Sequence, residues 1–456
     1  MKEIKNNVNG QNGFYGLNRL LNLLSVFIRK ICLISLLVFL HSFAFAQSDV
    51  PAPTPKQAKS IYLTHATIHV GDGKVLNNAT IGFENGKITF LEENPTFKTD
   101  ETMGKVIDCT GKQIYPGIIA PATKVGLDEI EAVRATNDYA EVGNYNPDAR
   151  AIIAYNTDSR VTPTVRSNGV LYAQSIPLYG TISGTSAVVQ LDAWNWEDAL
   201  IREDGVWMNW PSMIGYDEKN PTSRTNKDYE KQVSALKDYF RDAKSYFDAG
   251  THDKTNLRFE AMKGLFDKSK NLYVNVSYAK EIQNVIAFTQ ELNLNLVIVG
   301  GDDSYLMADE LAKKKIPVIL GKTHELPASD DDDIDQRFKT PAVLQKAGVL
   351  FCLSIPGGFW QERNLAFNAG SAVAYGLTKE QALAAITLNT AKILGVDKQI
   401  GSLEKGKEAS LIVSAGDVLD MKTSNIEYAF ISGRQIDLNN KQKELNAKFS
   451  KKYGVN

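Results

Sequence analysis

The chain has 456 residues, enough for two or three domains, and 43% of them are hydrophobic and 23% charged. This balance is typical of a folded protein and excludes a mostly disordered chain, a collagen-like fibre and a multi-span membrane protein. The 51 basic and 53 acidic side chains give no basic field for a nucleic acid partner, and three cysteines are too few for a disulfide scaffold.

Residues 1–46 are predicted to be a signal peptide. The basic pair Arg29-Lys30 precedes an apolar run over residues 31–45, and small residues before the end of this run suit cleavage after Ala46. Because residues 20–28 are also fairly apolar, an uncleaved membrane anchor is the alternative. Cleavage predicts an acidic mature protein that is periplasmic or secreted.

Short strands follow a proline-containing leader over residues 47–58. Residues 59–115 are predicted to form the first part of a β domain. Within it, two apolar segments at 80–84 and 87–90 flank Asn85-Gly86. This dipeptide supplies the two positive-φ residues of a type I′ turn, so a β-hairpin is expected here.

Apolar strands alternate with helices in the middle of the chain. The predicted strands are 272–278, 294–301, 316–321 and 349–355, and the predicted helices are 281–292, 304–315 and 340–347. Strands that are apolar throughout are typical of a parallel sheet covered on both faces. The length available favours a TIM-type (β/α)8 barrel over residues 116–395. Residues 140–230 alternate poorly, and insertions and long loops are expected there.

The chain returns to β structure near its end. Thr378 and Gln381 have the spacing of a capping box, which predicts a helix from this point to about Leu394. Strands are expected within residues 396–436, with a charged helix or frayed tail over 437–456. Because both ends of the chain are rich in β structure, the prediction is an α/β fold: the barrel plus a small β-sandwich domain built from both ends.

Six segments in order carry a resemblance to a known family. They are residues 66–73, 106–119, 376–383, 388–395, 400–409 and 430–434. They resemble the amidohydrolase superfamily, in particular its imidazolonepropionase-like branch. The resemblance implies a hydrolase of carbon–nitrogen bonds other than peptide bonds, acting on substrates such as cyclic amides. It also implies a zinc ion that activates a water molecule and is held by histidines, a lysine and an aspartate.

The expected metal ligands are replaced in this sequence. The family's Asp-x-His-x-His falls on Ala120, Ala122 and Lys124. Later strand ends, at residues 274–278, 298–302 and 352–356, carry no histidine or aspartate where the resemblance places one. The standard site is therefore predicted to be lost, with no metal-ligating residue assigned.

Other side chains at the predicted barrel mouth remain candidates for chemistry, because active groups of these barrels lie where strands end. The candidate catalytic residues are His324, Lys124 and Asp302, and the candidate ligand-binding residues are Asn275, Ser277 and Ser354. His324 follows a predicted strand, and Lys124 stands where a ligand histidine would. An ammonium group there can replace part of the charge of a metal ion.

Four adjacent carboxylates, Asp330–Asp333, follow His324 in the sequence. Oxygen ligands of this kind suit Ca²⁺ or Mg²⁺, although a solvated acidic loop is the favoured interpretation.

Two functional hypotheses follow. The favoured one is an exported, degenerate amidohydrolase relative that binds a small molecule, a short peptide or a partner. That partner would be an intact amidohydrolase homologue or another copy of the chain. The alternative is an active hydrolase with a rebuilt site that uses His324, Lys124 and acidic residues.

Overall fold

The computed structural model describes residues 24–31, 52–96, 102, 104–215, 225–327 and 331–455. The chain divides into two units, Met1–Asp49 and Val50–Asn456. In the first unit residues 24–31 are helical, and the predicted cleavage site at Ala46 lies outside the described residues. Over the described ranges, no helix combines the length and the apolar character needed to cross a membrane.

The two ends of the second unit share one sheet. Its strands are β1 (Ile61–His69), β2 (Val75–Glu84), β3 (Lys87–Glu93), β4 (Lys105–Asp108), β5 (Gln113–Pro116), β14 (Leu411–Ser414), β15 (Ile426–Ile431) and β16 (Arg434–Gln435). The strand order is β16-β15-β14-β5-β1-β2-β3, and β4 pairs with β1. The C-terminal strand β14 runs antiparallel to the N-terminal strand β5. This pairing confirms the predicted β domain built from both ends.

The hairpin between β2 and β3 turns at Asn85 and Gly86, whose φ angles are 50° and 78°. Two successive positive φ values are the geometry of a type I′ turn, as the sequence predicted. The sheet has its own core, to which Phe83 and Phe430 contribute a ring pair 5.1 Å apart.

A second eight-stranded sheet forms the barrel. Its strands are β6 (Ile118–Thr123), β7 (Val170–Ser175), β8 (Ile182–Gln190), β9 (Leu200–Asn209), β10 (Asn271–Val276), β11 (Leu296–Gly300), β12 (Val318–Leu320) and β13 (Phe351–Leu353). They lie in sequence order around the sheet. Strands β9 to β13 are parallel neighbours, and β6 is parallel to β7.

Strand β8 is the exception, because it runs antiparallel to both β7 and β9. The barrel is therefore not eight identical β/α units. Consecutive antiparallel strands need only short connections, so this part of the chain lacks the strand–helix rhythm of the rest. The poor alternation over residues 140–230 has this cause.

The barrel closes through the segment between two short helices, α10 (Lys379–Ala384) and α11 (Leu388–Leu394). The backbone N–H of Leu353 in β13 donates to Ala385 O at 3.0 Å, and that of Ile119 in β6 donates to Ile386 O at 2.9 Å. The predicted capping box at Thr378 is present. The single long helix predicted after it is instead broken, because its central carbonyl groups pair with the first and last strands.

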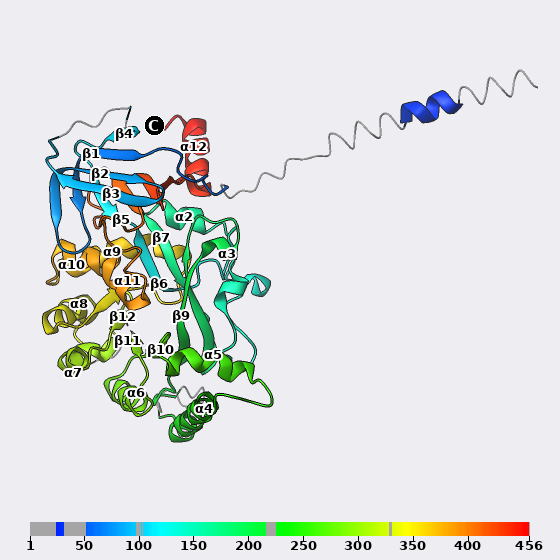
Figure 1. The fold of residues 1–456 in the computed structure, drawn as a ribbon, viewed down its shortest axis with the longest axis vertical. Helices are drawn as coiled ribbons and strands as arrows, with labels where there is room; N and C mark the ends of the chain where they lie inside the picture. Colours follow the sequence, from blue (N-terminus) through cyan, green and yellow to red (C-terminus); the bar gives the residue numbers. More distant parts are fainter. Residues whose placement is uncertain are drawn as a thin grey trace, which may run out of the picture. The chain divides into compact units, whose positions relative to one another are not determined.

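Further helices surround the barrel sheet. They are α2 (Thr162–Arg166), α3 (Trp196–Ala199), α4 (Tyr229–Ala249), α5 (Leu257–Phe266), α6 (Ala279–Glu291), α7 (Ala308–Lys314), α8 (Gln336–Ala347) and α9 (Leu365–Val373). Short 3-10 helices cover 134–136, 151–154, 302–307 and 360–364. Helix α12 (Lys441–Tyr453) ends the chain. Figure 1 shows α4, α6, α7 and α8 along the outside of the barrel sheet.

A buried ion cluster joins the barrel to the β domain. The carboxylate of Asp192 accepts from Arg166 at 2.5 Å and from Arg434 at 2.7 Å, and its own exposed fraction is 1%. The backbone N–H of Thr54 also donates to Asp192, at 3.2 Å. The proline-containing leader and the last hairpin are thus held against α2 by one carboxylate.

Candidate functional site

A cavity of about 440 Å³ lies at the end of the barrel where the parallel strands finish. Its lining comes from the ends of β6, β9, β10 and β11 and from the loops after β7 and β13. The lining residues are Ala122, Ile176, Pro177, Leu178, Tyr179, Gly180, Trp207, Asn209, Asn275, Val299, Pro356 and Gly357. None of these described residues carries a charge, so the cavity is neutral, with apolar, aromatic and carboxamide groups.

Two asparagines supply the polar groups of this cavity. The side chain of Asn209 is fully used in the structure, because its Nδ2 donates to Leu178 O and Gly180 O and its Oδ1 accepts from Asn275. Asn275 is exposed and donates to Asn209 at 3.0 Å. Within the described residues, its Oδ1 has no hydrogen-bond donor. Asn275 therefore presents an acceptor and a second N–H to the cavity, which agrees with its predicted place at the mouth.

Trp207 forms part of the wall beside the asparagines. Its indole ring stacks on Tyr273 at 5.1 Å, and its Nε1 is buried without a hydrogen-bond partner in the described part of the chain. Sequence analysis did not find Trp207 or Asn209, because β9 lies in the stretch whose strand–helix alternation is weak.

The backbone of β6 is distorted at Ala122, where the resemblance places a histidine. Ala122 has a φ of 57°, in the left-handed region, and the pairing of β6 with β7 shifts register between Ala120 and Thr123. The N–H of Ala122 donates to Gln174 Oε1 at 3.1 Å, and its carbonyl accepts from Gly357 at 2.9 Å. The loop after β13 thus lies directly against the end of β6.

A polar network inside the barrel holds Gln174 in this position. Asp204 accepts from Gln174 Nε2 at 2.6 Å, from Tyr273 at 2.6 Å and from Ser186 at 2.7 Å. Burial raises the pKa of the Asp204 carboxyl above its usual range, and the hydrogen bonds oppose that rise. Four strands therefore share one carboxyl group beneath the cavity.

Lys124 does not line the cavity. Its ammonium group lies 2.7 Å from Asp128, four residues later, and both side chains are buried, with exposed fractions of 8% and 0%. The rings of Tyr139 and Phe359 cover the ammonium at 4.6 and 5.1 Å from their centroids. Lys124 is therefore one half of an enclosed ion pair at the end of β6.

Asp302 also has its own partner. Its carboxylate lies 2.8 Å from Arg337 of α8, and the same guanidinium reaches Glu325 at 3.5 Å and donates to Leu326 O at 2.6 Å. This ion pair fastens the loop after β12 to the end of β11.

His324 is exposed and faces the outer helices. Its Nε2 is hydrogen-bonded to Ser371 of α9, and its ring lies 5.9 Å from that of Phe338 in α8. Among the described residues, no hydrogen bond or ion pair joins His324, Lys124 and Asp302 to one another. The three predicted catalytic residues are each engaged with a different group.

The two predicted serines differ from Asn275. Ser354 is fully buried, and its hydroxyl donates to Leu320 O at 2.7 Å. Ser277 lies beside Gly300 at the ends of β10 and β11, and its carbonyl accepts from Asp303 N at 2.9 Å. Neither contributes to the lining of the cavity.

Glu362 is a buried acid that was not predicted from the sequence. It lies in the 3-10 helix after β13 and is fully buried, with Thr123 and Lys322 as the neighbours that favour its charged form. Burial raises the pKa of the Glu362 carboxyl to about 8. A neutral carboxylic acid therefore lies near the barrel mouth at neutral pH.

The acidic loop is only partly described, since Asp330 lies outside the described residues. Asp333 pairs with Lys339 at 2.5 Å, which lowers the pKa of the Asp333 carboxyl, and Asp332 accepts from Tyr305 at 3.4 Å. Asp332 and Asp333 therefore each contact a protein side chain.

Four side chains at or near the strand ends of the barrel mouth do not suit zinc. They are a methyl group at Ala122, the paired ammonium of Lys124, a carboxamide at Asn275 and a hydroxyl at Ser354 that donates to Leu320 O. Zinc prefers thiolate, imidazole and carboxylate ligands. Across the described ranges, no group of three or more histidine, cysteine, aspartate or glutamate residues could hold a metal ion.

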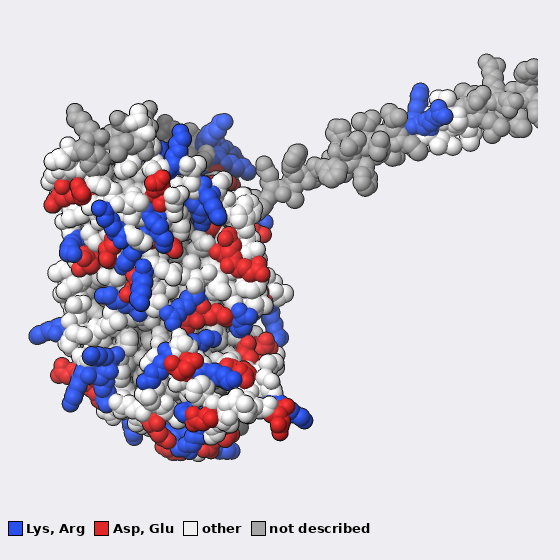
Figure 2. All heavy atoms as spheres, viewed as in Figure 1, with Lys and Arg blue, Asp and Glu red and all other residues white. Residues whose placement is uncertain are grey.

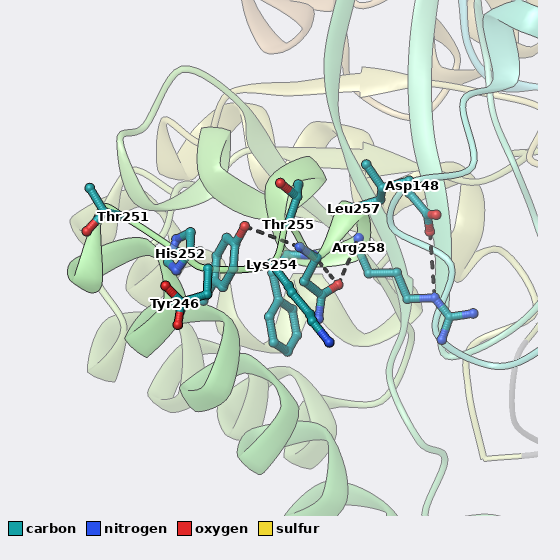
Figure 3. Close-up of a pocket in the computed structure, with 11 residues that line it drawn as sticks. Asp148, Tyr246, Thr251, His252, Lys254, Thr255, Leu257 and Arg258 are labelled. Carbon is teal, nitrogen blue, oxygen red and sulfur yellow. Dashed lines mark hydrogen bonds and ion pairs between the residues drawn. The ribbon is translucent and has the colours of Figure 1, made fainter.

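A larger hollow of about 880 Å³ lies on the surface beside α4 and α5 (Figure 3). The loop over residues 251–259 forms most of its lining, and Tyr246 stacks on His252 with ring centroids 3.4 Å apart. Arg258 reaches Asp148 across it at 3.8 Å. This hollow is built mainly from one exposed loop. The mouth cavity lies at the strand ends and is therefore the better candidate site.

Comparisons with known proteins agree with this architecture. The sequence model of the amidohydrolase family matches residues 231–436. No curated protein sequence matches the chain. An amidohydrolase structure from Thermotoga maritima MSB8 is 25% identical, with a TM-score of 0.73, over 83% of this chain and 99% of that chain.

Two more distant structures share the fold. A putative prolidase from Bifidobacterium longum is 16% identical over 88% of this chain and 100% of its own, with a TM-score of 0.50. An adenosine deaminase from Xanthomonas campestris with bound zinc is 14% identical over 88% and 99%, also with a TM-score of 0.50. The family model therefore assigns residues 231–436 to the amidohydrolase family, and the barrel joined to a composite β domain agrees with that assignment.

Proposed function

We propose that this protein is an exported, degenerate amidohydrolase that binds a small neutral molecule or a short peptide at the barrel mouth without hydrolysing it. The observation that carries the proposal is the cavity of about 440 Å³, which is present but lined by uncharged groups only. Such a cavity can hold a ligand by apolar contact and a few hydrogen bonds. It offers no base or metal ligand among its described lining residues to activate a water molecule.

The surroundings of the cavity support binding over a rebuilt hydrolase. A rebuilt site would need a base, an acid and an electrophile within reach of one bond. His324, Lys124 and Asp302 are instead engaged with Ser371, Asp128 and Arg337. Each of these contacts would have to break before the three groups could act on one substrate.

Two further parts of the proposal concern location and partners. The basic and apolar pattern of residues 1–46 supports export to the periplasm or beyond, with cleavage after Ala46. A protein that binds a ligand without catalysis could bind and support an intact amidohydrolase homologue, or pair with another copy of itself. Both are expectations from the sequence.

The ligand-binding role is tested with Asn275→Leu, which removes the acceptor and the donor facing the cavity at nearly constant volume. Neutral amides and short peptides are screened against the wild-type protein by ligand-detected NMR, and the affinity of each hit is then measured for the variant. We expect at least a tenfold loss of affinity, since an unmet hydrogen bond costs about 1–3 kcal/mol.

The matched control is Asn77→Leu, an exposed asparagine on β2 of the β domain, which should leave affinity unchanged. If every hit binds both variants as it binds the wild type, the mouth cavity is not the ligand site. Turnover of a hit by the wild-type protein would contradict the non-hydrolytic part of the proposal.

A further inference from the structure

Within the described residues, the hydrogen bonds between the terminal helix α12 and the rest of the protein lie near its start. Asn440, which caps the helix, donates to Ser167 at 2.8 Å, and Gln442 accepts from Thr164 of α2 at 2.8 Å. None of its 13 residues is buried. A helix that buries no residue gains little stability from packing within the protein. Apolar side chains aligned on one face of such a helix indicate a binding partner.

Apolar side chains do form a stripe along this helix. Leu445, Phe449 and Tyr453 are spaced four residues apart, so they lie on one face, and their exposed fractions are 39%, 45% and 67%. The rings of Phe449 and Tyr453 stack, with centroids 6.5 Å apart. Large apolar side chains in such an arrangement rarely remain in water on a protein surface.

Positive charge accompanies the stripe. The helix contains five lysines and one glutamate, whereas the whole chain has a net charge of −2. Lys448 and Lys452 lie over the rings of Phe449 and Tyr453, at 5.8 and 5.2 Å from the centroids. Figure 2 shows blue side chains at the end of the molecule where Figure 1 draws α12.

We propose that α12 binds the surface of an anionic lipid membrane. Charge complementarity favours an anionic partner, and the exposed leucine and aromatic rings favour one with an apolar interior below its charged surface. A lysine-rich helix with Leu and Phe on one face is the pattern of helices that lie in the membrane interface. No residue of α12 is buried, so its lysines and its apolar side chains can reach a lipid surface. This role is independent of the proposed ligand site.

The test uses the compact unit Val50–Asn456, so that the apolar N-terminal segment cannot itself bind lipid. Co-sedimentation is measured with vesicles of phosphatidylglycerol and phosphatidylcholine mixed, and with phosphatidylcholine alone. We expect binding to the anionic vesicles only, weakening as salt is raised. The triple variant Lys448→Gln/Lys451→Gln/Lys452→Gln should bind about a hundredfold more weakly, at roughly fivefold for each lysine.

The control removes the same charge elsewhere, with Lys231→Gln/Lys280→Gln/Lys313→Gln, three exposed lysines outside α12. It should bind like the wild type. Phe449→Ser should weaken binding to anionic vesicles without changing the melting temperature, since the ring is exposed. Absence of binding to anionic vesicles would overturn the proposal. Equal loss in the two triple variants, or equal binding to both vesicle types, would also overturn it.

Discussion

Replacing Glu362 with glutamine is expected to make the protein markedly more stable at alkaline pH and to change little at acidic pH. The carboxyl is fully buried, and burial raises its pKa from 4.5 to about 8 on folding against the opposing effects of Thr123 and Lys322. The folded state therefore holds this proton between pH 4.5 and 8 while the unfolded chain releases it. The stability contributed by the protonated acid is complete below pH 4.5 and is lost as pH rises through 8.

The size of the effect follows from the separation of the two pKa values. Each unit corresponds to about 1.4 kcal/mol, so the difference amounts to several kcal/mol by order of magnitude. Glutamine cannot ionise, so the free energy of unfolding of the variant does not fall for this reason as pH rises. The free energy of unfolding is measured by urea titration of wild type and variant at pH 5, 6, 7 and 8.5.

Exposed Glu84 provides the control, since Glu84→Gln should follow the wild type at every pH. The prediction concerns the difference between variant and wild type, because Asp204 and other groups titrate in both. If Glu362→Gln and wild type lose stability in parallel up to pH 8.5, Glu362 is not held as a neutral acid in the folded protein.

The second large effect is expected at Lys124. Replacing it with methionine keeps most of the side-chain volume but leaves Asp128, which is fully buried, without its cation. Breaking a buried ion pair in this way costs about 3–5 kcal/mol. The double variant Lys124→Met/Asp128→Leu should recover most of that loss, because it removes both charges. Chemical denaturation of the single and double variants gives the coupling energy.

Lys244→Met is the matched control, since Lys244 and Asp248 form a pair with the same four-residue spacing on the exposed face of α4. Losing an exposed pair costs less than about 1 kcal/mol. A cost at Lys124 no greater than at Lys244 would contradict the enclosed ion pair. A double variant no more stable than Lys124→Met would show that packing, rather than charge, is what the substitution disturbs.

Much of the architecture could be predicted from the sequence because it depends on short local patterns. Asn85-Gly86 predicted a turn, Thr378 and Gln381 predicted a helix cap, and continuous apolar runs predicted the parallel strands of the second half. Strand β8 was not predicted, because the direction of a strand depends on its neighbours rather than on its own residues. The break between α10 and α11 likewise depends on hydrogen bonds to β6 and β13.

The candidate site was predictable only in part. Strand-end position found Asn275, which lines the cavity, and Lys124, which lies beside it in a buried pair. Strand-end position does not show which way a side chain points. Ser354 and His324 were therefore also predicted as site residues, although the hydroxyl of Ser354 donates to Leu320 O and the imidazole of His324 is hydrogen-bonded to Ser371. Trp207 and Glu362 depend on tertiary burial, which no local pattern records.

We propose that the barrel mouth binds a ligand and does not hold a catalytic metal ion. The most direct measurement is elemental analysis of the protein purified without chelator from cells grown with added zinc, after dialysis. The account predicts zinc and other transition metals far below one ion per chain, because Ala122, Lys124, Asn275 and Ser354 offer no suitable ligand set. Stoichiometric zinc that survives dialysis and is lost on replacing residues at the mouth would contradict it.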